Sequence, residues 1–263
     1  MSQKPNAQTV VQDLLETISG LTSVDSFVRV TDNLLSEFRF RQLMRECDNI
    51  PEFSKRWLVK AILQLNFNRD LEIADSYFQK AIKLSKGDSE SWTHYPANLA
   101  DRGFISTAYY YFGKAVEEAP CKSTLFNLYS ASLDVRDGNT AKKAADLYKK
   151  LYYNDEAIDA WVESAMQFHE HVTKHTERLG YDGSLVTKVL LESQDFMASL
   201  GYKVPAVTHH LDDVRDEVFA LYHIVDITTE EVGHLNERLA DFIVDNDYLD
   251  AGVVIAVTSD KKE

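Results

Sequence analysis

The chain has 263 residues, of which 44% are hydrophobic, enough for one large domain or two ordinary ones with a core, so global disorder is not expected. Two cysteines, Cys47 and Cys121, are too few for a disulfide framework or a thiolate metal site. The net charge is −14, and residues 180–263 hold most of it, with 17 acidic against 6 basic residues. Because nucleic-acid binding needs a cationic surface, this argues against a direct nucleic-acid partner.

The N-terminus lacks the basic region and apolar run of a signal peptide. The longest apolar runs, such as 251–257, are too short to span a bilayer. We therefore expect a soluble, cytoplasmic protein with no membrane partner.

Helical periodicity dominates the first part of the chain. Residues 9–19 place apolar side chains on one helical face, and 24–37 with 39–48 predict a second helical pair that ends near Pro51. Three consecutive windows, 55–88, 89–122 and 123–156, then share a spacing of small and aromatic residues. A degenerate version of the same spacing covers 21–54.

The window 89–122 is the clearest of the three. Its marker residues are Trp92, Gly103, Ala108, Phe112, Ala115 and Pro120. Trp92 is expected to fill space between helices, Gly103 to supply a positive φ in the turn, and Pro120 to end the second helix. In the third window we expect two extra residues in the turn 136–140, which would put Ala144, Tyr148 and Leu151 at the core positions. A helix from about 155, with Trp161 inward, would cap the array.

These markers resemble the tetratricopeptide repeat (TPR) over about 21–165. The resemblance implies two antiparallel helices per repeat, stacked into a short α-solenoid with a concave groove. It also implies a binding scaffold rather than an enzyme. Residues 1–165 are therefore predicted to form a TPR-like helical domain.

The remaining residues, 166–263, predict an acidic α+β module. Strands are expected at 166–172, 202–211, 218–227 and 251–258, with helices at 184–200 and 229–244. Thr228 and Glu231 form the capping box of the second helix. This β-α-β-β-α-β order is ferredoxin-like, so the whole chain is predicted to be mostly α with a small α+β end. The alternative is that 208–226 forms one more helix, because its apolar residues also fit a heptad.

The residues Leu200–Val204, the pair His209-His210 and the acidity of 165–260 resemble the ribonuclease E inhibitor B family. Those proteins are acidic regulators that act by binding protein, without catalysis. No functional residue of that family carries over to a position of this chain.

The sequence contains no nucleotide-binding loop, hydrolase elbow or HExxH zinc motif. His169, His171 and His175 could supply a zinc pair on a helix, since 171 and 175 are four residues apart. Spacing fixes no third ligand, so we predict no catalytic residue, metal or cofactor. A metal-dependent enzyme built on these histidines remains an alternative.

The resemblance to TPR proteins places ten residues in the groove. They are Arg56, Val59, Leu63, Asn66, Glu90, Thr93, Ala97, Asn127, Ala131 and Asp134. Arg56 is the single cation among them, so a carboxylate clamp for chaperone tails is not expected. The alternative is that these positions pack the protein's own N-terminal helix.

We therefore hypothesise a non-enzymatic regulator or inhibitor that binds a protein partner through the groove and the acidic module. Complementary charge favours a basic partner, such as a nuclease, a toxin or a nucleic-acid-binding protein. A structural scaffold that assembles oligomers is the alternative function.

Overall fold

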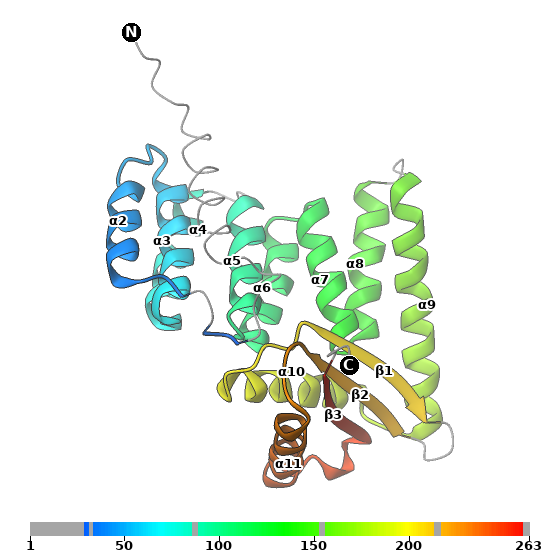
Figure 1. The fold of residues 1–263 in the computed structure, drawn as a ribbon. Helices are drawn as coiled ribbons and strands as arrows, with labels where there is room; N and C mark the ends of the chain where they lie inside the picture. The colour runs from blue at the N-terminus through cyan, green and yellow to red at the C-terminus, as the bar shows by residue number, and fades with distance from the viewer. Residues whose placement is uncertain (1–28, 32–33, 86–88, 153–155, 213–216, 260–263) are drawn as a thin grey trace. The chain divides into compact units, whose positions relative to one another are not determined.

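The computed structural model describes residues 29–31, 34–85, 89–152, 156–212 and 217–259 (Figure 1). Within these ranges the chain is mostly helical and carries a small three-stranded sheet near its C-terminal end, which confirms the predicted class at this level. The chain divides into two compact units, Met1–Pro120 and Cys121–Glu263. The predicted helix at 9–19 lies outside the described residues.

The first unit is built from helices that pack in consecutive pairs, α3 with α4 and α5 with α6. Its helices are α2 (Glu37–Cys47), α3 (Phe53–Asn68), α4 (Leu71–Ser85), α5 (Ser89–Asp101) and α6 (Ile105–Glu118). Helix α2 begins after Ser36, whose hydroxyl accepts the N–H of Arg39 at 3.3 Å. The described residues 29–31 and 34–36 are not helical, so the predicted helix over 24–37 is wrong there.

An aromatic cluster forms the core between α4, α5 and α6. The Phe78 ring stacks on Tyr95 with centroids 4.2 Å apart, and meets Trp92 edge-on at 5.4 Å. Tyr111 packs edge-on against Phe78 from α6, and its hydroxyl donates to the Asp75 carboxylate. Trp92 is 6% exposed, so it fills space between helices as predicted.

The second unit continues with helices and ends in the sheet. Its helices are α7 (Lys122–Asp134), α8 (Gly138–Leu151), α9 (Glu156–Leu179), α10 (Gly183–Ser199) and α11 (Thr229–Asp245), with a short 3₁₀ turn, η2 (Leu249–Ala251). Helix α8 packs between α7 and α9. The domain boundary proposed at residue 165 falls inside α9.

Buried positions recur in the second helix of each pair. They are Ala74, Phe78 and Ala81 in α4, Ala108, Phe112 and Ala115 in α6, and Ala141, Ala145 and Tyr148 in α8. The shift is 34 residues from α4 to α6 and 33 from α6 to α8. Of the residues predicted at the core positions of α8, Ala144 and Tyr148 are buried and Leu151 is 43% exposed, and the 33-residue shift does not require the predicted two-residue insertion. The turn is short because Asp137 caps α8 at once, accepting the N–H of Thr140 at 2.9 Å.

Residues 166–172, predicted as a strand, belong to α9. The buried residues of this helix, Val162, Ala165 and His175, are spaced for one helical face, and half-buried Val172 and Thr176 continue that face. Packing of this long face against α8 outweighs the local alternation of 166–172.

The sheet has the order β1-β2-β3, from β1 (Ala206–Asp212), β2 (Glu217–Ile224) and β3 (Val253–Ser259). Strands β1 and β2 are antiparallel, with Ala206 opposite His223, and β2 and β3 are parallel, with Val218 opposite Val253. The predicted β-α-β unit at 218–258 is confirmed, and the single helix over 208–226 is wrong. The first strand of the predicted β-α-β-β-α-β order is absent, because that segment is helical.

Helices α10 and α11 hold the sheet through buried polar contacts. The Tyr222 hydroxyl lies 2.6 Å from the Ser193 hydroxyl and 3.2 Å from the carbonyl of Leu190, both on α10. Asn236 of α11 accepts the N–H of Val257 at 2.7 Å and donates to its carbonyl at 3.2 Å, which satisfies the outer edge of β3. Thr228 and Glu231 form the predicted capping box of α11.

Across the described ranges, no helix is both long enough and apolar enough to cross a bilayer.

Candidate binding surfaces

Three of the predicted groove residues lie in the interior of the first unit. Val59 and Leu63 are fully buried, and Asn66 is 2% exposed. The carbonyl of Asn66 accepts the N–H of Leu35 at 2.7 Å, and its side-chain oxygen accepts the Arg102 guanidinium through Nε at 3.0 Å and Nη2 at 2.5 Å. These residues therefore contribute packing rather than an accessible surface.

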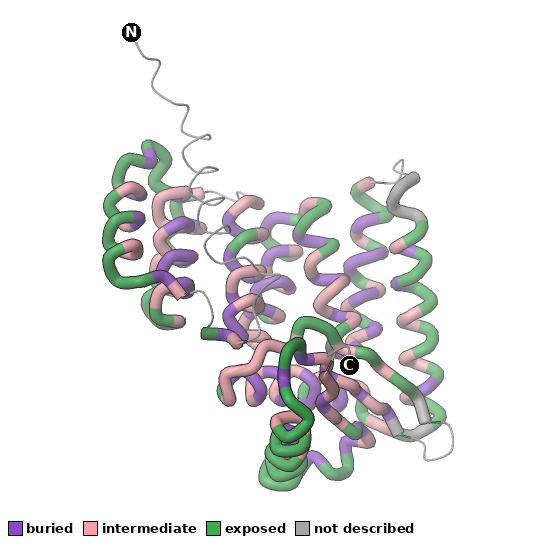
Figure 2. The backbone as a smooth tube through the Cα atoms, viewed as in Figure 1, coloured by how far each residue is buried: buried purple, intermediate pink, exposed green. Residues whose placement is uncertain are grey.

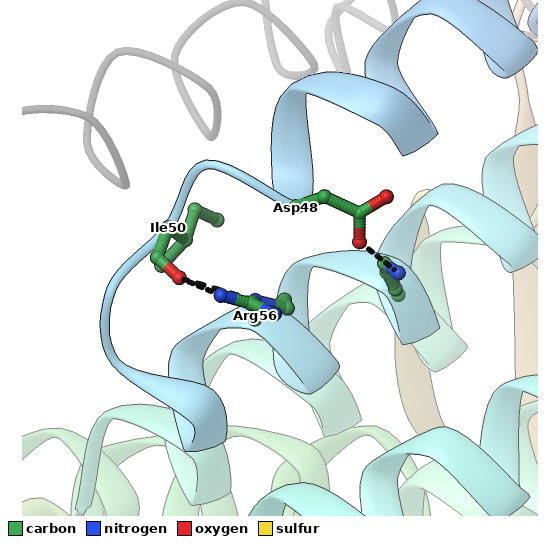
Figure 3. Close-up of polar contacts among 4 residues, drawn as sticks. Asp48, Ile50 and Arg56 are labelled. Atoms are coloured by element: carbon green, nitrogen blue, oxygen red, sulfur yellow. Dashed lines mark hydrogen bonds and ion pairs between the residues drawn. The ribbon is translucent and has the colours of Figure 1, made fainter.

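Arg56, the predicted groove cation, fastens the turn between α2 and α3 (Figure 3). Its Nε and Nη2 donate to the carbonyl of Ile50 at 3.1 and 2.7 Å, and its guanidinium lies 4.7 Å from the centre of the Phe53 ring. Beside it, Lys60 donates to the Asp48 carboxylate at 2.7 Å, and this hydrogen bond lowers the pKa of Asp48. Arg56 thus has a structural role that the sequence did not indicate.

The groove residues of α5 keep partial exposure on one helical face. Glu90, Thr93 and Ala97 are half-buried. Glu90 forms an ion pair with Lys55 at 3.0 Å, and the Thr93 hydroxyl donates to the carbonyl of Ser89 at 2.8 Å. This face offers small side chains but few unsatisfied polar groups.

In the second unit, the groove residues lie along α7. Asn127 and Ala131 are half-buried, and Asp134 is exposed. The backbone carbonyl of Asp134 lies 3.1 Å from Nε2 of His209 on β1. Asp134 therefore joins α7 to the sheet through its main chain, a contact that repeat spacing could not predict.

The three histidines of α9 are not brought into a common site. His169 is half-buried, His171 is exposed and His175 is 6% exposed, with the rings of 171 and 175 stacked 6.4 Å apart. In the part of the chain that the structure describes, no three His, Cys, Asp or Glu residues are placed to hold a metal ion. The third ligand that the zinc hypothesis required is not found there.

His209 and His210 point to opposite faces of β1, as expected for neighbours on a strand. Since the Asp134 carbonyl is an acceptor, Nε2 of His209 donates, which leaves Nδ1 unprotonated in the neutral ring. That Nδ1 is buried without a hydrogen-bond partner. Burial first, and then the charge of Arg136, lower the pKa of His209 to about 4.

Helix α11 carries an acidic face that composition alone could not locate. Much of α11 is exposed (Figure 2). Its exposed acids include Glu230, Glu237, Asp241 and Asp245, and none of these four forms an ion pair with a described residue. Carboxylates four residues apart repel each other, and those in the last turn oppose the helix dipole. The repulsion among Glu237, Asp241 and Asp245 therefore lowers the stability of the C-terminal part of α11, whereas Glu230 lies in the first turn, where an acid is favourable.

Apolar side chains lie at the C-terminal end of this acidic face. Val244 is 58% exposed and Leu249 of η2 is 68% exposed. Large apolar side chains beside charge are typical of the core and rim of protein interfaces. The term acidic face denotes the surface of α11 and η2 that carries these four carboxylates together with Val244 and Leu249.

No protein-family model, curated protein or solved structure matches this chain.

Proposed function

We propose that this chain is a non-enzymatic protein-binding regulator that captures a basic protein through the acidic face. The observation that carries the proposal is the set of four exposed carboxylates on α11 that lack ion-pair partners among the described residues. Three of them, Glu237, Asp241 and Asp245, repel one another along the helix, and a cationic partner would relieve that repulsion. Partner candidates are a nuclease, a toxin or a nucleic-acid-binding protein.

The helical pairs are proposed to form a TPR-like scaffold for this binding. The recurrence of buried small and aromatic residues at shifts of 34 and 33 supports the assignment, since TPR units repeat every 34 residues. Left-handed turns after α3, α5 and α7, at Arg69, Gly103 and Arg136, support it further. Within each unit, packed helical pairs would supply a rigid scaffold and additional contact area, from the half-buried face of α5 in the first unit and of α7 in the second.

Charge and apolar area would have different tasks in the complex. The carboxylates would speed association and select basic surfaces, while Val244 and Leu249 would be buried at the centre of the contact. Affinity is therefore expected to fall steeply as salt rises, because screening weakens the exposed charges.

The test is capture of partners from a lysate of the native host, followed by identification and measurement with the purified partner. In the test variant, Glu230, Glu237, Asp241 and Asp245 are changed to Gln or Asn. The control neutralises three exposed acids outside α11 that form no ion pair with a described residue, namely Glu72, Glu118 and Glu163, and is compared with a three-site α11 variant that changes only Glu237, Asp241 and Asp245.

The proposal predicts that the α11 variants lose a basic partner that the control variant retains. Circular dichroism of all three variants verifies that they are folded. Equal affinity of the control and the three-site α11 variant for the captured partner, or affinity that does not change with salt, would contradict the proposal.

A further inference from the structure

A pocket of about 540 Å³ lies within the second unit, lined by residues of α8, α9, α10 and the turn before α8. Its volume lies in the range of small-molecule binding sites. The lining includes two cationic side chains and two neutral polar ones, namely Arg136, Lys143, Asn139 and Thr187. The pocket shares none of the residues of the acidic face.

Arg136 is the unusual member of this lining. The residue is 5% exposed, and burial lowers its pKa to about 10. Its guanidinium forms no hydrogen bond or ion pair with any residue that the structure describes. A largely buried charge that no described residue pairs is unfavourable, and a guanidinium has five donors to satisfy.

None of the three acidic lining residues, Asp137, Glu177 and Asp182, pairs with Arg136, and Glu177 is exposed. Asp137 accepts the N–H and hydroxyl of Thr140 at 2.9 and 2.7 Å, and Asp182 accepts the N–H and hydroxyl of Ser184 at 2.9 and 2.7 Å. Both carboxylates are thus engaged in capping their own helices, α8 and α10, which leaves Arg136 and Lys143 as the cations available to a ligand.

Three further lining residues have donors to offer. The Lys143 ammonium, the Asn139 amide and the Thr187 hydroxyl have no side-chain hydrogen bond or ion pair within the described ranges. A guanidinium beside an ammonium, an amide and a hydroxyl is the donor set that carboxylate and phosphate groups require.

We propose that this pocket binds a small molecule through an oxyanion group, a carboxylate or a phosphate, held by Arg136 with Lys143 as the second cation. Such a ligand would give the guanidinium a partner that the described residues do not supply. The site would add small-molecule control to a protein whose binding surface lies elsewhere in the sequence, on α11. The proposed oxyanion site does not depend on which protein binds the acidic face.

The experiment follows thermal unfolding of the full chain during titration with inorganic phosphate, and separately with acetate, at constant ionic strength set by sodium chloride. A ligand that binds only the native state raises Tm with concentration. Phosphate also stabilises proteins in general, so the readout is the difference between variants. Isothermal titration calorimetry then gives the affinity.

Three variants make the test specific. Arg136→Gln should weaken binding at least about tenfold, since hydrogen bonds to a charged group are lost. Lys143→Gln alters an exposed side chain, so it should fold normally, and it should weaken binding less. Arg69→Gln is the matched control, because that arginine occupies a similar left-handed turn but bonds to the carbonyl of Arg102, and it should bind as the parent does.

A response to phosphate alone assigns a phosphate ligand, a response to acetate alone assigns a carboxylate, and a response to both assigns the shared oxyanion chemistry. The proposal is overturned if neither anion raises Tm above the chloride control. It is also overturned if Arg136→Gln and Lys143→Gln both respond as the parent does.

Discussion

The turn between α3 and α4 and the turn between α7 and α8 place an arginine in the same backbone conformation, with opposite consequences for its charge. Arg69 has φ 57° and Arg136 has φ 54°. Arg69 donates to the carbonyl of Arg102 at 3.2 and 2.9 Å, whereas no described residue bonds the Arg136 guanidinium. One arginine ties neighbouring turns together, and the other lines a pocket. Local conformation therefore does not determine the role of either residue, which depends on the acceptors around it.

The largest effect is expected where the arginine network of the first unit is broken. Arg102 is 1% exposed and donates to the Asn66 side chain and to the carbonyl of Val30 at 3.3 Å. Arg102→Met leaves these buried acceptors without a donor, so the free energy of unfolding should fall by about 3 kcal/mol. Urea unfolding measures it. A loss below about 1 kcal/mol would mean that the network contributes little, and would weaken the contrast with Arg136.

A glycine in the second unit tests how much a left-handed conformation costs when space is also lacking. Gly252 has φ 65°, and a Cβ there would lie 2.0 Å from Cζ of Tyr181. Gly252→Ala should therefore lower the free energy of unfolding by about 2 kcal/mol, since it adds steric overlap to backbone strain. Gly233→Ala, in α11 with nothing within 4 Å, should stabilise instead by about 0.5–1 kcal/mol. Equal effects of the two substitutions would refute this explanation.

The two turn arginines are compared directly by replacing each with Gln and measuring the free energy of unfolding in a buffer free of phosphate and carboxylate. Arg69→Gln should cost about 1–2 kcal/mol, because hydrogen bonds from a charged group to a buried carbonyl are lost. Arg136→Gln should cost less than about 0.5 kcal/mol, or stabilise, because it removes a largely buried charge that no described residue pairs. Denaturant unfolding of both variants decides the matter. Similar losses would show that Arg136 is structural, and the proposed pocket would lose its main support.

The pH dependence of stability extends this comparison to His209. Its folded pKa of about 4 lies below the unfolded value of 6.5, so between these values the unfolded state binds more protons. Stability from this group is fully present above pH 6.5 and is lost as pH falls through 4. The loss should be on the order of 1 kcal/mol, after allowance for solvent screening of a half-buried ring. NMR titration should show a higher pKa of His209 in Arg136→Gln, because the nearby positive charge is removed. An unchanged pKa would show that the charge of Arg136 does not act on His209.

Much of the helical part could be predicted because small and aromatic residues there report directly on packing. Ala74, Phe78 and Ala81 predict the buried face of α4, and the same spacing predicts that of α6. In the C-terminal part, the Thr228 capping box and the apolar strand after α11 were equally direct signals. Each is a local pattern with one physical interpretation.

The remaining features depend on contacts between distant parts of the chain. Repeat spacing predicts Val59 and Leu63 in a groove, yet both are fully buried, because spacing does not show what covers a helix face. The segment 166–172 alternates locally, yet packing along the full length of α9 makes it helical. The burial of Arg136 had no signal in composition. Its occurrence 33 residues after Gly103, at a position that repeatedly adopts positive φ, could have identified the turn but not the missing acceptor.

The smallest expected effects come from two charge reversals on α11, which distinguish a role in helix stability from a role in binding. Asp245 lies in the last turn, where its charge opposes the helix dipole and repels Asp241, so Asp245→Lys should stabilise the free chain by about 0.5 kcal/mol. Glu230 lies in the first turn, where an acid is favourable, so Glu230→Lys should destabilise by a similar amount. Yet both substitutions should weaken capture of a basic partner, because both remove negative charge from the acidic face. If affinity instead follows stability, rising for Asp245→Lys and falling for Glu230→Lys, the carboxylates act through helix stability and the acidic face is not the binding surface.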